Sequence, residues 1–137
     1  MARRRAPIGL PSALTIDGSI RVLLCTFAEL PDGSARGFDP HSSGRDTVFL
    51  VRQGDRLSAW VNRCPHHGTP LAWRRNAYLN AAGDRIVCGA HGAQFAIDTG
   101  LCTLGPCLGD RLTPAQVQVH NNGEVHLIHN NCQETSP

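Results

Sequence analysis

The sequence predicts an all-β domain built from short antiparallel strands and long loops. Stretches of β-branched and apolar residues are short, glycine and proline separate them frequently, and no stretch sustains the 3.6-residue apolar period of a helix. The 137 residues include 41% hydrophobic and 18% charged side chains, which indicates one globular domain and excludes a disordered chain. No run approaches the ~18 consecutive apolar residues of a membrane span, so we expect no membrane attachment.

The expected strands and turns follow in order along the chain. Gly54-Asp55 is expected to turn one hairpin, and Asn121-Asn122-Gly123 is a strong signal for a second hairpin near the C-terminal end. Glycines and prolines predict a loop over residues 30–45, and residues 71–82 are compatible with a helical turn. Strands are expected at residues 20–25, 47–51, 57–61, 86–87 and 94–97, and in the last hairpin at 117–119 and 125–127.

The chain is interpreted as one domain with two short flanking segments. Residues 1–13 are expected to be a flexible basic N-terminal segment, residues 14–130 the folded domain, and residues 131–137 a polar C-terminal tail. No apolar stretch of the kind found in export signals follows Arg3-Arg4-Arg5. We therefore expect a cytoplasmic protein, in which cysteines stay reduced.

The charged residues bear on two classes of function. Thirteen basic and eleven acidic side chains leave a net charge of +2, which is too balanced for nucleic-acid binding by charge alone. Every basic residue is an arginine. Mechanisms that need a catalytic lysine are therefore excluded.

Six cysteines and seven histidines are the distinctive part of the composition, and two short motifs contain four of them. Cys64 and His66 form a C-x-H motif, and after 21 intervening residues Cys88 and His91 form a C-x-x-H motif. Two thiolates and two imidazoles match a [2Fe–2S] cluster in which two histidines replace two cysteines on one iron. Structural zinc is the alternative, although zinc motifs usually space their paired cysteines two to four residues apart.

Glycines follow both motifs. Gly68 and Gly92 allow sharp loops in which backbone amides approach the cluster sulfurs, and such hydrogen bonds tune the reduction potential. The C-x-H spacing assigns His66 as the ligand, so His67 is interpreted as a loop residue.

These segments resemble the Rieske [2Fe–2S] proteins, in particular the small Rieske-type ferredoxins. The resemblance extends from about residue 48 to residue 128 and is carried by residues 64–71, 88–95, 98–100 and 102–107. It implies that Cys64 and Cys88 hold the buried iron, that His66 and His91 hold the outer iron, and that a loop containing Pro106 covers the cluster. The implied fold is a sandwich or incomplete barrel of antiparallel sheets with a cluster-binding subdomain at one end.

The sequence departs from the pattern of the high-potential Rieske proteins of respiratory complexes. Their extra cysteine pair corresponds here to Thr69 and Ala90, so that disulfide cannot form. Their hydroxyl side chains near the cluster correspond to Ala93 and Phe95, which donate nothing, and we expect a potential at the low end of the Rieske range. The gap between the ligand pairs is also long, and residues 81–84 are expected to be the tip of an extra hairpin.

The remaining cysteines, histidines and tryptophans receive structural interpretations. Cys102 and Cys107 are expected to be free thiols in a reducing cytosol, with a disulfide as the alternative. Arg74 and Arg75 beside Trp73 suggest a solvated loop, with a docking surface for an acidic redox partner as the alternative. We expect Cys25 and Trp60 in the core, Cys132 as an exposed thiol, and His120, His126 and His129 on the surface.

The function expected from this resemblance is electron transfer rather than catalysis. The leading hypothesis is a soluble one-electron carrier that takes electrons from a flavoprotein reductase and passes them to a partner such as a terminal oxygenase. The alternatives are a small subunit of a larger oxidoreductase of the nitrite reductase or oxygenase type, and a zinc-bound binding module without a redox role.

Overall fold

The computed structural model describes residues 19–65, 68–72, 74–90 and 92–130. Within these ranges the chain forms strands and a single short 3-10 helix, η1 (Phe27–Glu29), which confirms the expected all-β class. No described helix has the length and apolar character needed to cross a membrane. The strands are β1 (Ser19–Thr26), β2 (Ala35–Phe38), β3 (Val48–Gln53), β4 (Arg56–Val61), β5 (Arg85–Val87), β6 (Gln94–Ala96), β7 (Cys102–Leu104), β8 (Val117–Val119) and β9 (Glu124–Asn130).

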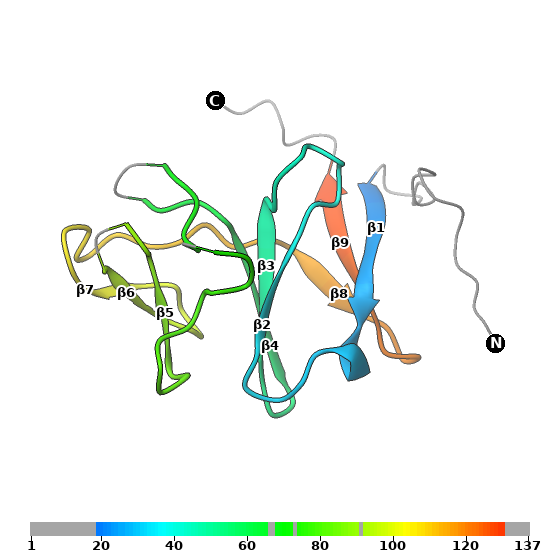
Figure 1. Cartoon of the computed structure of the whole chain (residues 1–137). Coiled ribbons are helices and arrows are strands. Elements are labelled where there is room, and N and C mark those ends of the chain that lie inside the picture. The colour runs from blue at the N-terminus through cyan, green and yellow to red at the C-terminus, as the bar shows by residue number, and fades with distance from the viewer. Residues whose placement is uncertain (1–18, 66–67, 73, 91, 131–137) are drawn as a thin grey trace.

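These strands form three antiparallel sheets of three strands each. The orders are β1-β9-β8, β2-β3-β4 and β5-β6-β7. In Figure 1 the β2-β3-β4 sheet lies between the other two, with β5, β6 and β7 at one end of the molecule and β1, β8 and β9 at the other. This arrangement agrees with the expected antiparallel sheets and separate end region.

Both predicted hairpins are confirmed. In the first, Gln53 pairs with Arg56, so Gly54-Asp55 forms the two-residue turn, and Gly54 has the positive φ (61°) that favours glycine there. In the second, β8 pairs with β9 so that Val119 lies opposite Val125. Residues 81–84 also turn back as expected, because an antiparallel bridge joins Leu79 to Ile86.

Two local predictions are wrong. Residues 30–45 are not entirely loop, because β2 lies within them and pairs with β3. Gly37, which suggested a loop, is needed in this strand because a side chain there would come within 2.5 Å of Asp46 Oδ2 and of the Tyr78 hydroxyl. The described part of residues 71–82 contains turns and the bridge at Leu79 rather than a helical turn.

The middle sheet separates two apolar cores. Alternate residues of a strand point to opposite faces, and β3 is apolar and buried on both. Phe49 and Val51 belong to the core beneath β5, β6 and β7, together with Cys64, Cys88, Phe95, Cys102 and Cys107. Val48 and Leu50 belong to the second core, together with Cys25, Leu30, Phe38 and Val125. We call these the cysteine-side core and the base core.

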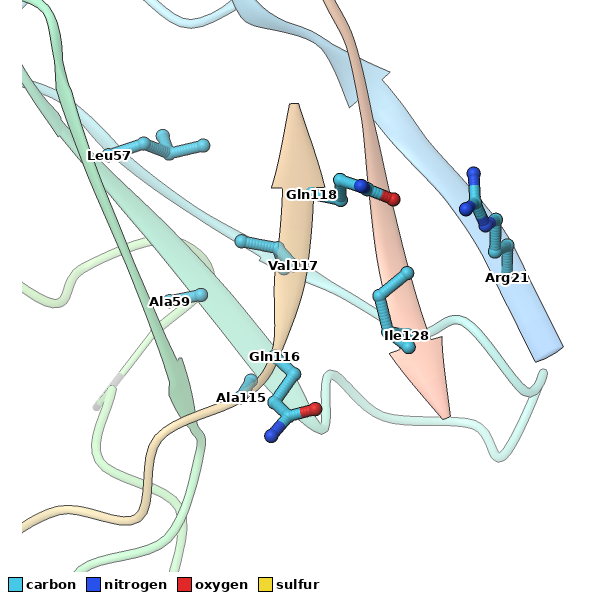
Figure 2. A pocket seen from close by; sticks show the side chains of 8 residues that line it. All are labelled: Arg21, Leu57, Ala59, Ala115, Gln116, Val117, Gln118 and Ile128. Atoms are coloured by element: carbon cyan, nitrogen blue, oxygen red, sulfur yellow. The ribbon is translucent and has the colours of Figure 1, made fainter. Parts of the chain in front are cut away.

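A hollow of about 580 Å³ lies on the side of the molecule that holds the base core. Figure 2 shows Leu57 and Ala59 on β4 facing Val117 on β8, with Ile128 of β9 and Arg21 of β1 beyond them. It marks the gap where the middle sheet and the β1-β9-β8 sheet diverge. None of its lining residues belongs to the cysteine motifs.

Candidate metal centre

The first cysteine motif is a tight loop that follows β4. The Cys64 amide donates to the carbonyl of Thr69 at 2.7 Å, and the Gly68 amide donates back to the carbonyl of Cys64 at 2.6 Å. Gly68 has a φ of 75°, a value that favours glycine. The loop therefore closes on itself through its own backbone.

The second motif, after β5, repeats the same hydrogen bonds at the same offsets. The Cys88 amide donates to the carbonyl of Ala93 at 2.8 Å, and the Gly92 amide donates to the carbonyl of Cys88 at 2.9 Å. Gly92 has a φ of 73°, almost that of Gly68. The two cysteines thus occupy equivalent positions in two matched loops, although the histidine spacing differs between the motifs.

Both motif cysteines are deeply buried. Cys64 is 2% exposed and Cys88 is 1% exposed, and both are thiols rather than halves of disulfides. Burying a thiolate is costly unless a neighbouring charge compensates it, which a metal ion does directly. Two buried cysteines presented by matched loops therefore fit the thiolate side of a soft metal centre. His66, His67 and His91 lie outside the described residues.

A chain of hydrogen bonds holds the two loops together. The Asn62 side chain donates through Nδ2 to the carbonyl of Asp46 at 2.9 Å and accepts at Oδ1 from the Leu71 amide at 2.8 Å. The Leu71 carbonyl accepts in turn from the Gly89 amide at 2.7 Å. Sequence reasoning missed Asn62. Its only signal was a polar residue between an apolar strand and the first cysteine, which is too common to single out.

A third segment, from β7 to Cys107, covers the second loop. Gly105 packs so tightly that an added Cβ would lie 2.8 Å from Ala93 Cα, and its φ of 110° also favours glycine. Gly105 is therefore required by contact and by backbone conformation. The neighbouring Pro106 is exposed.

Cys102 and Cys107 face each other beneath this segment. Both are 2% exposed and both are thiols, as expected from the sequence. The Cys107 thiol donates to Cys102 Sγ at 3.1 Å, and the Cys102 thiol donates to the carbonyl of Leu104 at 3.3 Å. Burial raises the pKa of Cys107 to about 12, helped by the adjacent Cys102 and by Cys64, so its thiol stays protonated in the closed structure.

Trp60 connects the middle sheet to the end of the molecule formed by β5, β6 and β7. Its indole Nε1 donates to the carbonyl of Ile97 at 3.2 Å, and its ring lies so close to Gly100 that a Cβ there would be 2.7 Å from it. The predicted core position of Trp60 is confirmed, since the residue is 6% exposed.

The other predictions have mixed outcomes. Cys25 is buried in the base core, as expected. Arg74 and Arg75 are exposed, whereas Trp73, Cys132 and the side chain of His129 lie outside the described residues. Among the side chains that the structure describes, no group of three or more His, Cys, Asp or Glu is placed to hold a metal ion.

His126 is more buried than the expected surface side chain. Its side chain is only 16% exposed, and its ring packs edge-on against His120 with centroids 4.5 Å apart. The buried Nδ1 atom of His126 has no hydrogen-bond partner. Burial lowers the pKa of His126, and His120 and Arg21 lower it further, against the opposing effect of Glu124.

Comparison with known families gives one match that covers most of the described chain. The model of the Rieske [2Fe–2S] domain matches residues 21–121. Among curated proteins, the oxidoreductase NdmD of Pseudomonas putida is 30% identical over 77 residues. That match covers 56% of this chain but only 12% of the relative.

Solved structures resemble the chain over most of its length. The ferredoxin of carbazole 1,9a-dioxygenase from Nocardioides aromaticivorans IC177 is 28% identical with a TM-score of 0.60, and the match covers 80% of this chain and 97% of that chain. The Sphingomonas yanoikuyae B1 ferredoxin shares the fold at 21% identity, with a TM-score of 0.58 and coverage of 78% and 96%. The terminal oxygenase of carbazole 1,9a-dioxygenase from Novosphingobium sp. KA1 has a TM-score of 0.63 at 21% identity, with coverage of 85% and 31%.

Proposed function

The chain belongs to the Rieske [2Fe–2S] domain family, and from that premise we propose that it is a one-electron carrier of an oxygenase system. In this role it takes an electron from a reductase and delivers it to a terminal oxygenase. We propose residues 14–130 as the functional domain and the cytoplasm as its location, since the motif cysteines must stay reduced to bind iron.

The observation that carries the proposal is the pair of matched loops with buried cysteines. We assign Cys64 and Cys88 to one iron and His66 and His91 to the other. Gly68, Gly92 and Pro106 complete the surroundings of the cluster. When bound, such a cluster supplies reversible one-electron chemistry at a potential between about −150 and +300 mV. The protein contributes the fixed positions of the ligands, the exclusion of water from the thiolates, and the backbone donors around the sulfurs.

The fraction of each solved structure that the match covers supports the carrier role. The match includes 97% of the Nocardioides ferredoxin but 31% of the Novosphingobium oxygenase chain. The match to NdmD, where the similar segment is 12% of a larger oxidoreductase, favours a second candidate: a fixed relay within a larger enzyme. Pull-down of a tagged chain distinguishes the two, because a carrier is recovered alone and a relay is recovered with its large subunit.

The test of the cluster is visible and low-temperature EPR spectroscopy of anaerobically purified protein before and after dithionite, with iron and sulfide counted. We expect a red-brown protein that bleaches on reduction and gives a Rieske-type EPR signal. A colourless, zinc-replete protein would contradict the proposal.

His66 and His67 provide a matched pair of variants for the ligand assignment. In the two backbone-equivalent loops His67 and His91 both lie three residues after their cysteine, whereas the C-x-H motif assigns His66. We expect His66→Ala to lose the Rieske spectrum and His67→Ala to keep it. The reverse result would overturn the assignment of His66 while leaving the cluster proposal intact.

The surroundings of the site support a low potential. Ala93 and Phe95 are buried and carry no hydroxyl that could donate to the cluster or its ligands. Fewer donors leave the reduced state less stabilised. We expect a redox titration to give a midpoint in the lower part of the range, and a value well above about +100 mV would contradict this.

A further inference from the structure

Cys102 and Cys107 are not among the four ligands, yet they are buried beside the second ligand loop. Their sulfurs are 3.1 Å apart, which is within reach of the ~2.05 Å bond of a disulfide after a small side-chain movement. They lie five residues apart in the chain, so pairing them closes a short ring. The base core supplies a contrast, because Cys25 is the one cysteine among the described residues of that core.

The backbone holds the two cysteines opposite each other. The Cys102 amide donates to the carbonyl of Asp110 at 2.8 Å, and the Asp110 amide donates to the carbonyl of Cys107 at 2.8 Å. Asp110 thus fixes both residues relative to one another, whatever the state of their sulfurs. The segment between them contains Gly105, which contacts Ala93 at the end of the second ligand loop.

We propose that Cys102 and Cys107 are a reversible disulfide-forming pair that locks the covering segment when a low-molecular-weight disulfide is present. One thiol, deprotonated during a local opening, attacks the small disulfide and releases one small thiol. The second cysteine then attacks the mixed disulfide and releases the other. The net reaction converts one small disulfide and two cysteine thiols into one protein disulfide and two small thiols.

The residues that flank the two sulfurs in the chain are open to solvent, which gives a reagent an approach when the segment opens locally. Residues 103–106 and 108–111 on either side of Cys107 are exposed, and Leu108 is 67% exposed. Closing the ring restricts the segment that packs on the second ligand loop. The locked form should therefore lose its cluster more slowly than the reduced form. This inference concerns the cysteine pair alone and holds whether the chain is a free carrier or a fixed relay.

The experiment treats the holoprotein, in a Cys132→Ser background, with oxidised glutathione. We expect the intact mass to fall by two hydrogen atoms while the visible cluster spectrum is kept, and dithiothreitol to reverse the change. No arginine lies between Ile86 and Leu108, so fragment-ion spectra of one tryptic peptide assign the cross-link and exclude Cys88. Cys102→Ser and Cys107→Ser should each abolish the mass change, and Cys25→Ser should not.

Two outcomes would overturn the proposal. In the first, both thiols remain free for alkylation after denaturation, or one carries only a glutathione adduct. In the second, the cross-link forms, but the oxidised and reduced proteins lose their visible cluster absorption in chelator with equal half-lives. We expect instead a several-fold longer half-life for the oxidised form. A protein that lacks the cluster spectrum from the start would instead refute the proposed function, since the cross-link is scored by mass.

Discussion

The two faces of the middle sheet are stabilised in different ways. On the base side, β1 and β9 pair along almost their whole length, and the core is formed mainly by aliphatic and aromatic side chains. On the cysteine side, β5, β6 and β7 have three residues each, and four cysteines belong to the core. Short strands and turns supply few ladder hydrogen bonds there, so the loops depend on local backbone bonds and on a bound metal group.

This difference indicates a different source of stability on each side of the middle sheet. We expect hydrophobic burial to hold the base core, whereas a bound metal contributes folding energy on the cysteine side. The less regular side brings the two cysteine loops and the covering segment together at one place. The predictions below test this comparison, beginning with the largest effect.

Removing a ligand should damage one side selectively. We expect Cys88→Ser to lose all iron–sulfur absorption and the hydrogen-exchange protection of β5, β6 and β7, while β1 and β9 stay protected. Cys25→Ala is the control in the base core and should keep the full visible spectrum. Equal loss of protection on both sides in Cys88→Ser would show that the two cores fold as one unit.

Gly105→Ala tests whether the covering segment must touch the second ligand loop. The added methyl group would lie 2.8 Å from Ala93 Cα in a backbone with φ of 110°. We expect a loss of about 2–4 kcal/mol in the free energy of unfolding from overpacking and backbone strain together. Denaturant titration measures this loss.

Gly109→Ala is the matched control for the contact. Gly109 lies two residues beyond this segment with a φ of 92° and has nothing within 4 Å of an added Cβ. The variant therefore carries backbone strain alone, at about 1 kcal/mol. Equal losses in the two variants would mean that the contact with Ala93 contributes nothing.

The sequence predicted the two hairpins more completely than the end formed by β5, β6 and β7. Alternating valines around Asn121-Asn122-Gly123 and the turn at Gly54 define hairpins through local chemistry, so both were predictable. β2 was missed because glycine is unfavourable in strands. Gly37 is needed there because a Cβ would collide with Asp46 and Tyr78, and Tyr78 is distant in sequence.

At the site, the motifs predict the ligand residues, which stay a prediction, and they marked the loop glycines, but they did not show how the loops are joined. The hydrogen bonds of Asn62 and the fit of Gly105 against Ala93 depend on tertiary contacts. The pairing of Cys102 with Cys107 was left open for the same reason, since spacing alone does not determine the distance between two sulfurs.

Trp60→Phe tests the connection between the middle sheet and the end formed by β5, β6 and β7. The change keeps an aromatic ring beside Gly100 but removes the donor to the buried carbonyl of Ile97. We expect a loss of about 1–2 kcal/mol in the free energy of unfolding, because a buried acceptor loses its partner. Thermal and denaturant unfolding measure the change, and a neutral result would mean that water replaces the indole donor.

The smallest expected effect is a pH dependence of the free energy of unfolding that comes from His126 on β9. The pKa of His126 is lowered in the folded protein, mainly by burial, whereas in the unfolded chain it returns to about 6.5. Stability from the neutral ring is therefore complete above pH ~6.5 and declines as the pH falls from there through the folded pKa, because the unfolded state binds the proton first. Far-UV circular dichroism in denaturant at pH 7.5 and 5.5 should show this decline in wild type and a smaller one in His126→Gln. An equal decline in wild type and His126→Gln would place the titrating group at another residue.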